Sequence, residues 1–244
     1  LSIKDFTELE KYILHRLWEI NNIIKECVKT FNFHLMFTTL LNFCSNDLSA
    51  FYFDIRKDTI YCDPINSIKR RASRSLLDII YNYLIRWLAP SLSFTCEEAW
   101  QARGNKSSIH LEDFMSTDED FKNDNLNKKW EIIKDVRKVI TGALEKKRAD
   151  KIIGSSLEAH IKVYLSEDLT SQIKDIDLSE ISITSSFETL SFNKVNNGFK
   201  IEEIANISVE VEKVIGNKCQ RCWKYKEKLA NEDICIRCED AIKK

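Results

Sequence analysis

Cys219-Gln220-Arg221-Cys222 is followed, after twelve intervening residues, by Cys235-Ile236-Arg237-Cys238. Two residues between a pair of thiols let one tight turn present both sulfurs to the same ion, and two such pairs complete a tetrahedral four-sulfur site. This donor set favours Zn²⁺ with no open coordination position, so we expect a structural site. A segment this short has too little apolar area to fold alone, and metal binding worth about 10–16 kcal/mol would stabilise it. The spacing predicts a zinc knuckle with one structural Zn²⁺, held by Cys219, Cys222, Cys235 and Cys238.

Two disulfides or free thiols are the alternative for these four cysteines, and an iron–sulfur cluster is a weaker one. The other four cysteines, Cys27, Cys44, Cys62 and Cys96, are scattered along the chain. Scattered thiols with one clustered quartet are typical of a reducing compartment and a metal site rather than of a disulfide framework. We therefore expect a cytoplasmic protein.

The segment around the cysteines is basic and carries aromatic residues. From residue 213 to residue 244, nine Lys or Arg face five Asp or Glu, which leaves about +2 once four thiolates and one Zn²⁺ are counted. Cations beside exposed rings suit single-stranded nucleic acid, because phosphates are neutralised while bases stack. The predicted RNA contacts here are Arg221, Trp223, Lys224 and Arg237. The alternative, that Trp223 only packs the knuckle, remains open because a small module must bury something.

Upstream of the knuckle the apolar period is two. Leu157 to Leu165 alternates apolar and polar residues, as does Ile207 to Val211, and both indicate half-buried strands. Ile181 and Ile183 suggest a further strand, and Asn196-Asn197-Gly198 a hairpin-type turn between Phe192 and Phe199. Before them, apolar residues at helical spacing predict a long helix over 126–151, ended by Gly154.

The first hundred residues predict a helical bundle. Apolar residues recur every three or four positions over 6–30, then from Phe33, Phe37, Leu40 and Leu41 to Leu48, and from Ser67 to Leu88, where Pro90 ends the helix. Phe51 to Pro64 breaks this pattern and is expected to be a connection. Thr95-Cys96-Glu97-Glu98 is interpreted as a capping box that starts a short helix through Trp100.

A second basic cluster lies at the start of the third predicted helix. Arg70 and Arg74 are four residues apart and share a face, so with Arg71 they could follow a phosphate backbone. A solvated helix face with salt bridges is the alternative. The candidate RNA contacts of the bundle are therefore Arg70, Arg71 and Arg74.

No reaction centre is predicted. The four histidines form no metal pair or nucleophile motif, and the five isolated glycines form no phosphate-binding loop. No apolar run approaches the length of a membrane span, so no membrane partner is expected. The chain opens at Leu1 without Met, which we interpret as the interior of a longer protein.

Several segments together resemble the C-terminal region of bacterial class I isoleucyl-tRNA synthetases, over nearly the whole chain. Cys96 stands where that family usually has alanine, a change of one small residue for another. The resembling segments are Phe51 to Cys62, Trp87-Leu88-Ala89-Pro90 with Ser93 to Trp100, Ala143 to Arg148 leading to Ile153 to Ala159, and Cys219 to Trp223 with Cys235 to Cys238.

This resemblance implies a mainly α chain: a helical-bundle anticodon-binding domain over 1–116, a linker, long helix and small α/β domain over 117–212, and the zinc module over 213–244. It implies recognition of the anticodon stem-loop of isoleucine tRNA, by a monomer whose catalytic and editing domains belong to the same polypeptide. The ATP-site motifs of class I synthetases are absent from this sequence, so ATP would bind only the catalytic domain and this part alone would be inactive. A free-standing zinc-ribbon nucleic-acid-binding protein, and a zinc module acting only as a structural cap, are the alternatives.

Overall fold

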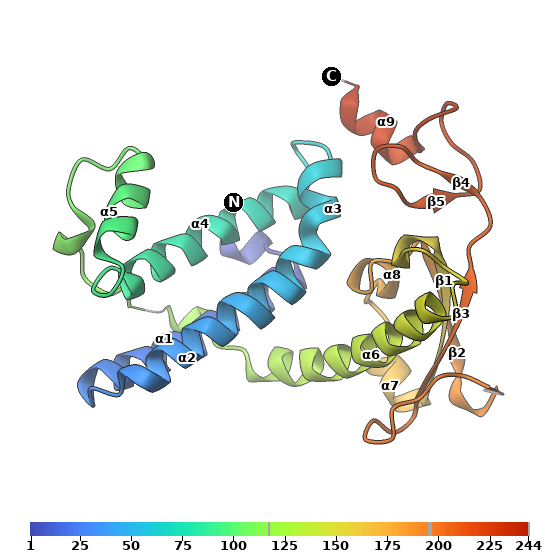
Figure 1. The fold of residues 1–244 in the computed structure, drawn as a ribbon, viewed down its shortest axis with the longest axis horizontal. Coiled ribbons are helices and arrows are strands. Elements are labelled where there is room, and N and C mark those ends of the chain that lie inside the picture. Colours follow the sequence, from blue (N-terminus) through green and yellow to red (C-terminus); the bar gives the residue numbers. More distant parts are fainter. Residues whose placement is uncertain (117, 195–196, 244) are drawn as a thin grey trace. The chain divides into compact units, whose positions relative to one another are not determined.

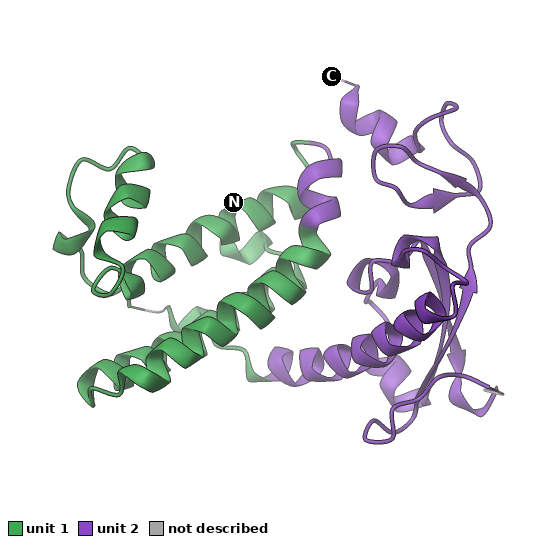
Figure 2. Ribbon diagram, in the orientation of Figure 1, with its two compact units in different colours: residues 1–56, 65–124 green, residues 57–64, 125–244 purple. Residues whose placement is uncertain are grey.

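The structure, a computed structural model, describes residues 1–116, 118–194 and 197–243. They form two compact units, residues 1–56 with 65–124 (unit 1) and residues 57–64 with 125–244 (unit 2) (Figure 2). The main elements of unit 1 are α1 (Glu8–Lys29), α2 (Phe33–Asn42), the π-helix η2 (Phe43–Phe53), α4 (Ile68–Leu88) and α5 (Ser93–Ala102). Those of unit 2 are α6 (Asp124–Ala149), β1 (Ala159–Leu165), α7 (Glu167–Ile173), α8 (Leu178–Ile181), β2 (Ser186–Ser191), β3 (Ile207–Lys213), β4 (Asn217–Lys218), β5 (Tyr225–Lys226) and α9 (Ile236–Ile242). Helix α3 (Asp54–Cys62) contributes residues to both units.

Unit 1 is a helical bundle built around α1. The apolar stripe predicted from the sequence is buried, and α1 packs against α2, η2 and α4 (Figure 1). Burial of this stripe rather than helix propensity is what stabilises a helix of this kind. A smaller apolar cluster, Ile85, Ala89, Cys96, Trp100 and Ile109, packs α5 against the end of α4. The prediction of a mainly helical chain with a small sheet and a C-terminal cysteine cluster is confirmed.

The expectation that 51–64 is a connection is wrong, because η2 and α3 make this stretch helical. Tyr52, Ile55 and Thr59 are buried at helical spacing. Arg56 is also buried, and its charge interrupts the apolar pattern in the sequence. Its partner is Glu10 on α1, which it contacts at 2.7 and 2.9 Å. The helical face is thus completed by an ion pair between residues distant in sequence, which periodicity cannot reveal.

The buried stripe of the second helix differs from the predicted one. Phe33, Phe37 and Leu41 are exposed, whereas Met36 and Leu40 are buried. Met36 and Leu40 are four residues apart on one face of α2, which packs against α1 and η2, so this narrower face is the one that is covered.

The predicted capping box at Thr95 is also wrong. Helix α5 begins at Ser93, so Thr95 lies inside its first turn, and Leu92 at the N-cap makes no side-chain cap. The carboxylate of Glu97 instead accepts hydrogen bonds from the Ser108 hydroxyl (2.8 Å) and the Ile109 amide (3.0 Å). It therefore fixes the loop after α5 rather than the start of the helix.

Unit 2 contains a three-stranded sheet in the order β2-β1-β3 among the residues described. β1 pairs in parallel with β2 and antiparallel with β3, with Val163 opposite Val209. The predicted long helix is α6, which ends at Ala149, where Lys151 and not Gly154 takes the left-handed conformation (φ 57°). On α6, a Cβ at Gly142 would lie 2.7 Å from the ring of Phe199, so the helix and this ring approach closely.

The second strand does not lie at Ile181 and Ile183, as the sequence had indicated. Asp177 caps a short helix, α8, that includes Ile181, and Ile183 has a positive φ of 57°. The strand follows instead as β2. The expected turn at Asn196-Asn197-Gly198 lies partly outside the described residues. Phe199 pairs with Val209 and not with Phe192.

In the part of the chain that the structure describes, no helix combines the length and apolar character needed to cross a membrane.

Candidate metal centre and nucleic-acid interface

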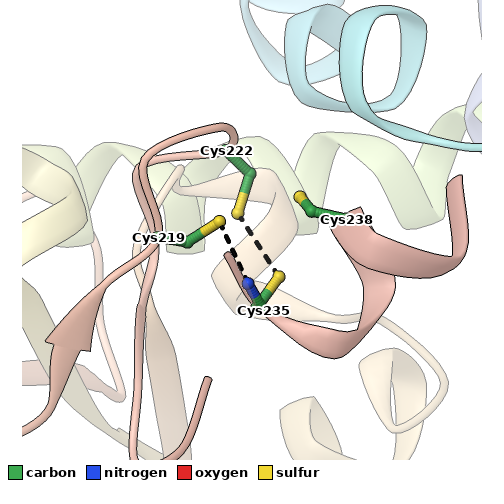
Figure 3. A group of neighbouring side chains, drawn as sticks. All are labelled: Cys219, Cys222, Cys235 and Cys238. Atoms are coloured by element: carbon green, nitrogen blue, oxygen red, sulfur yellow. Dashed lines mark hydrogen bonds between the residues drawn. The ribbon is translucent and has the colours of Figure 1, made fainter. Parts of the chain in front are cut away.

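The four cysteines of the knuckle converge at one point (Figure 3). Their sulfur atoms all lie within 4.8 Å of one another, and the four residues are between 0 and 8% exposed. The Sγ atoms of Cys222 and Cys235 are 3.9 Å apart. Zn–S bonds of about 2.3 Å in a tetrahedron require sulfurs about 3.8 Å apart, so the spacing fits such an ion. All eight cysteines are free, which disagrees with the disulfide alternative.

The first cysteine pair is held by a tight turn between β4 and β5. The Cys219 amide donates to the carbonyl of Lys224 (3.0 Å), and the Trp223 amide donates to the carbonyl of Cys219 (2.8 Å). Gly216, at φ 146°, forms the bend before β4. A Cβ at this position would lie 2.6 Å from the carbonyl oxygen of Lys226, so the bend requires glycine. The turn brings both sulfurs to one side.

The second pair lies at the start of α9. Cys235 is the N-cap residue and Cys238 lies in the first turn, so three residues of helical spacing place both sulfurs on one face. The Gln220 amide donates to the Asp233 carbonyl (2.8 Å), and the Cys235 amide points at the sulfur of Cys219 (3.4 Å). These bonds join the two halves of the knuckle.

The pKa values of the knuckle's thiols are shifted in different directions. Burial raises the pKa of the Cys222 and Cys238 thiols. Burial also acts to raise the pKa of Cys219, but hydrogen bonds from the backbone amides of Cys222, Cys235 and Arg221 outweigh it and lower that pKa to about 6. Amide donors favour the thiolate, and the thiolate is the form of cysteine that binds a metal ion. A bound ion would contribute structural cross-linking here, since four protein ligands leave it no position for a substrate.

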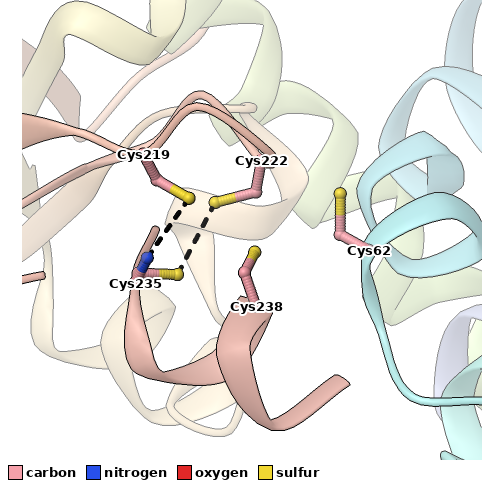
Figure 4. Packing of buried hydrophobic residues seen from close by; sticks show 5 residues of the cluster. All are labelled: Cys62, Cys219, Cys222, Cys235 and Cys238. Carbon is pink, nitrogen blue, oxygen red and sulfur yellow. Dashed lines mark hydrogen bonds between the residues drawn. The ribbon is translucent and has the colours of Figure 1, made fainter. Parts of the chain in front are cut away.

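Residues 57–64 of unit 2 lie against the knuckle. Cys62 packs beside the four cysteines (Figure 4), and its thiol donates to the carbonyl of Arg221 (3.8 Å). The Arg221 guanidinium donates to the carbonyls of Tyr61 and Cys62 at the end of α3. Arg237 contacts both carboxylate oxygens of Asp58 at 2.6 Å. Lys224, also predicted to contact RNA, lies 4.0 Å from Asp58.

Trp223 does not pack into the knuckle. It is 59% exposed, and the Lys218 ammonium lies 5.8 Å from its ring centroid. Its φ is 63°, in the left-handed region that costs a bulky residue conformational energy. A ring kept in a strained position without being buried disagrees with the alternative that Trp223 fills the core of the module.

The basic residues of α4 lie in unit 1. Ser67 caps the helix by accepting from the Arg70 amide (3.4 Å). Arg71 and Arg74 are exposed, and Arg70 is half-buried. Two of the three predicted phosphate contacts are therefore accessible on the first two turns of this helix.

Sequence reasoning missed Asp58 and Asp63, the acidic partners of the knuckle's arginine Arg237. Both lie in the segment 51–64, for which the sequence pattern predicts a connection. The helical spacing of Ile55, Thr59 and Cys62 would have placed Asp58 on a helix, but its partner could not be found without the structure.

A family model described as the anticodon-binding domain of tRNA ligase matches residues 10–164, which is more than half of the chain. The chain belongs to this family. The match spans the bundle and reaches β1, regions that a free-standing zinc ribbon would lack. This agrees with the resemblance inferred from the sequence.

Curated relatives agree with this assignment. The chain is 43% identical over 226 residues to the isoleucine–tRNA ligase of Agrobacterium fabrum and 45% identical over 225 residues to that of Pelagibacter ubique. Both alignments cover 92% of this chain, but 23% and 24% of those proteins. The isoleucine–tRNA ligase of Gluconobacter oxydans is 41% identical over 247 residues, covering 99% of this chain and 25% of that protein. The chain thus spans about a quarter of the length of the relatives it matches.

Proposed function

We propose that this chain is the RNA-recognition part of a cytoplasmic isoleucine–tRNA ligase and binds the anticodon stem-loop of isoleucine tRNA. The family match and the named relatives support the RNA class and the amino acid. In this proposal the ATP-dependent reaction, and any editing, belong to other domains of a monomeric ligase. The chain contributes by binding the RNA in a fixed orientation, which lowers the entropic part of the barrier.

One structural Zn²⁺ belongs to this proposal, held by Cys219, Cys222, Cys235 and Cys238. The mutual spacing and burial of the sulfurs support it. The proposal also divides the chain into three modules, over 1–116, 117–212 and 213–244. The last of these modules depends on the metal for its fold.

The observation that carries the recognition role is the exposed ring of Trp223 beside the closed cysteine site. We propose that Trp223 stacks on an unpaired base of the anticodon loop, a contact worth about 1–3 kcal/mol. Arg71 and Arg74 of α4, with Arg70, would contact phosphates and orient the RNA. Arg221, Lys224 and Arg237 are also predicted direct contacts, but each already contacts residues 57–64, so phosphates would compete with those partners.

The contacts of these three cations favour a second candidate function, in which the knuckle is a structural cap and never contacts RNA. Three of its basic side chains are engaged within unit 2. Under this alternative the ring of Trp223 would have no role in binding.

Two substitutions of Trp223 separate the candidates. Trp223→Gly removes the ring and suits the positive φ, so the fold should tolerate it, while Trp223→Tyr keeps a stacking surface. Stacking predicts that the glycine variant binds isoleucine tRNA about 5- to 150-fold more weakly, with zinc retained, and that the tyrosine variant stays near wild type. Equal affinity of all three proteins would favour the cap.

A further inference from the structure

One carboxylate of α3 binds both halves of the metal knuckle. Asp58 accepts two hydrogen bonds from Arg237, Nη1 to Oδ2 and Nη2 to Oδ1, each 2.6 Å long. It also lies 4.0 Å from the ammonium of Lys224. Arg237 immediately precedes the ligand Cys238, and Lys224 follows the ligand Cys222 by two residues. Asp58 is therefore the shared partner of both cysteine pairs.

Asp58 and Arg237 form a bidentate pair, in which two N–H groups of the guanidinium face the two carboxylate oxygens. Such bidentate, charge-assisted pairs restrict orientation as well as adding energy, unlike a single contact from a mobile lysine. Asp63 adds a second contact, 3.4 Å from Nη1 of Arg237. Burial acts to raise the pKa of Asp58, but Arg237 and Lys224 outweigh it and hold that pKa below its usual range.

A second anchor lies at the end of the same helix. Arg221 donates to the carbonyls of Tyr61 and Cys62, which belong to the last turn of α3 and have no further helical partners. A cation is favoured at this negative end of a helix. The knuckle is thus held through Arg221 as well as through the pair at Asp58.

Trp223 lies between these anchored residues. Arg221 precedes it by two positions and Lys224 follows it directly, and both side chains contact residues 57–64. The exposed ring therefore projects from a turn whose flanks are held on either side. A binding group held in advance loses less entropy when its ligand arrives.

We propose that Asp58 is a positioning residue for RNA recognition, which holds the knuckle on the last turn of α3 and so fixes the orientation of Trp223. This inference rests on the proposed RNA-binding function. Asp58 itself does not contact RNA, and the engaged cations Arg237 and Lys224 act through it rather than on phosphates.

The direction in which one substitution changes the RNA affinity tests this role. Asp58→Asn removes a negative charge and releases two cations, so electrostatics alone would strengthen binding to an RNA. Positioning predicts the reverse, about fivefold weaker binding of an isoleucine tRNA transcript by the whole chain with one zinc still bound. Asp175→Asn is the matched control, because Asp175 is an exposed carboxylate of the same unit, and its affinity should equal or slightly exceed that of wild type. Unchanged or tighter binding by Asp58→Asn would overturn the proposal.

A double variant distinguishes positioning from direct contact by Arg237. If the two residues act as one unit, Asp58→Asn with Arg237→Gln binds no more weakly than the weaker single variant. Losses that multiply would mean that Arg237 contacts RNA itself, and would overturn the assignment.

Hydrogen exchange keeps this test separate from that of the proposed function. With zinc bound, the amides of residues 219–224 should exchange faster in Asp58→Asn than in wild type or Asp175→Asn. If wild type fails to bind the transcript, the proposed function is wrong. The recognition role of Asp58 is then wrong as well, even if faster exchange in Asp58→Asn shows that Asp58 holds the knuckle. Unchanged exchange would overturn the anchoring in either case.

Discussion

Arg56 and Glu10, 46 positions apart, form a buried ion pair in unit 1. Nε of Arg56 lies 2.7 Å from Oε1 of Glu10, and Nη2 lies 2.9 Å from Oε2. The hydroxyls of Tyr52 and Ser73 each donate to Oε1 at 3.0 Å, and that of Thr7 donates to Oε2. The carboxylate therefore joins α1 to η2, α3 and α4, and the paired oxygens offset part of the cost of burying its charge.

Removing one partner of this pair should destabilise unit 1 strongly. Arg56→Met leaves a buried carboxylate without its cation, which costs about 3–5 kcal/mol. Urea unfolding followed by hydrogen exchange of α1 peptides reports the change. The control is Lys29→Met, whose pair with Glu26 is 74% and 67% exposed and is expected to contribute below about 1 kcal/mol. Similar effects of the two substitutions would contradict the importance of the buried pair.

The same carboxylate predicts a pH dependence. Burial acts to raise the pKa of Glu10, but Arg56 and the hydrogen-bond donors outweigh it and leave that pKa below the usual value of 4.5. A group with a lowered folded-state pKa stabilises the fold above its unfolded pKa, and this contribution is lost as the pH falls through the folded value. Wild type should therefore exceed Glu10→Gln in stability by a constant amount above about pH 5, with the difference shrinking below about pH 4.5. Because both proteins carry the knuckle, its own acid sensitivity cancels in this difference. A gap that widens on acidification would show the opposite shift.

Loss of one ligand should abolish the metal site. Cys238→Ser is expected to reduce bound zinc from about one per chain to near zero and to unfold the knuckle, because metal binding supplies its folding energy. Elemental analysis of the dialysed protein measures the ratio. Cys44→Ser, which changes a half-buried thiol of unit 1, should keep the full ratio. Zinc retained by Cys238→Ser would mean that the ion is bound elsewhere.

Gly216 offers a test of the knuckle's backbone. Its φ of 146° and the carbonyl 2.6 Å from an added Cβ predict that Gly216→Ala weakens zinc binding by about 1–3 kcal/mol. Competition with a zinc chelator measures this loss. Gly154→Ala is the comparison, because a Cβ there meets only the flexible carboxylate of Glu158. Equal zinc affinities for both variants would show that the bend before β4 tolerates a side chain.

The sequence predicted best what depends on local spacing. The cysteine pairs are such a case, because two thiols three residues apart can share one ion whatever surrounds them, and the stripe of α1 is another. It failed where distant residues compensate each other. The charge of Arg56 interrupts the apolar pattern in the sequence. Arg56 can nevertheless be buried because Glu10, on another helix, pairs with it. Ile181 and Ile183 alternate as in a strand, but the Asp177 side chain caps a short helix over Leu178–Ile181, and this local hydrogen bonding overrides the apolar alternation.

In the candidate site, too, local motifs were predictable and contacts between distant residues were not. The four ligands and Trp223 were identifiable from motif and composition, and the structure brings the ligands together. The roles of Arg221, Lys224 and Arg237 could not be read in this way, because their partners Asp58, Tyr61 and Cys62 lie about 160 residues or more earlier in the chain. Charge composition shows that cations are present, but it does not show which of them are already engaged.

Binding to RNAs that differ only in the anticodon tests the central claim most directly. The zinc-loaded chain should bind an isoleucine tRNA transcript with an affinity that falls as salt rises, and about tenfold or more weakly once the anticodon is replaced, which corresponds to about 1.4 kcal/mol of base-specific contact. Equal affinity for the two transcripts would contradict anticodon recognition by this chain.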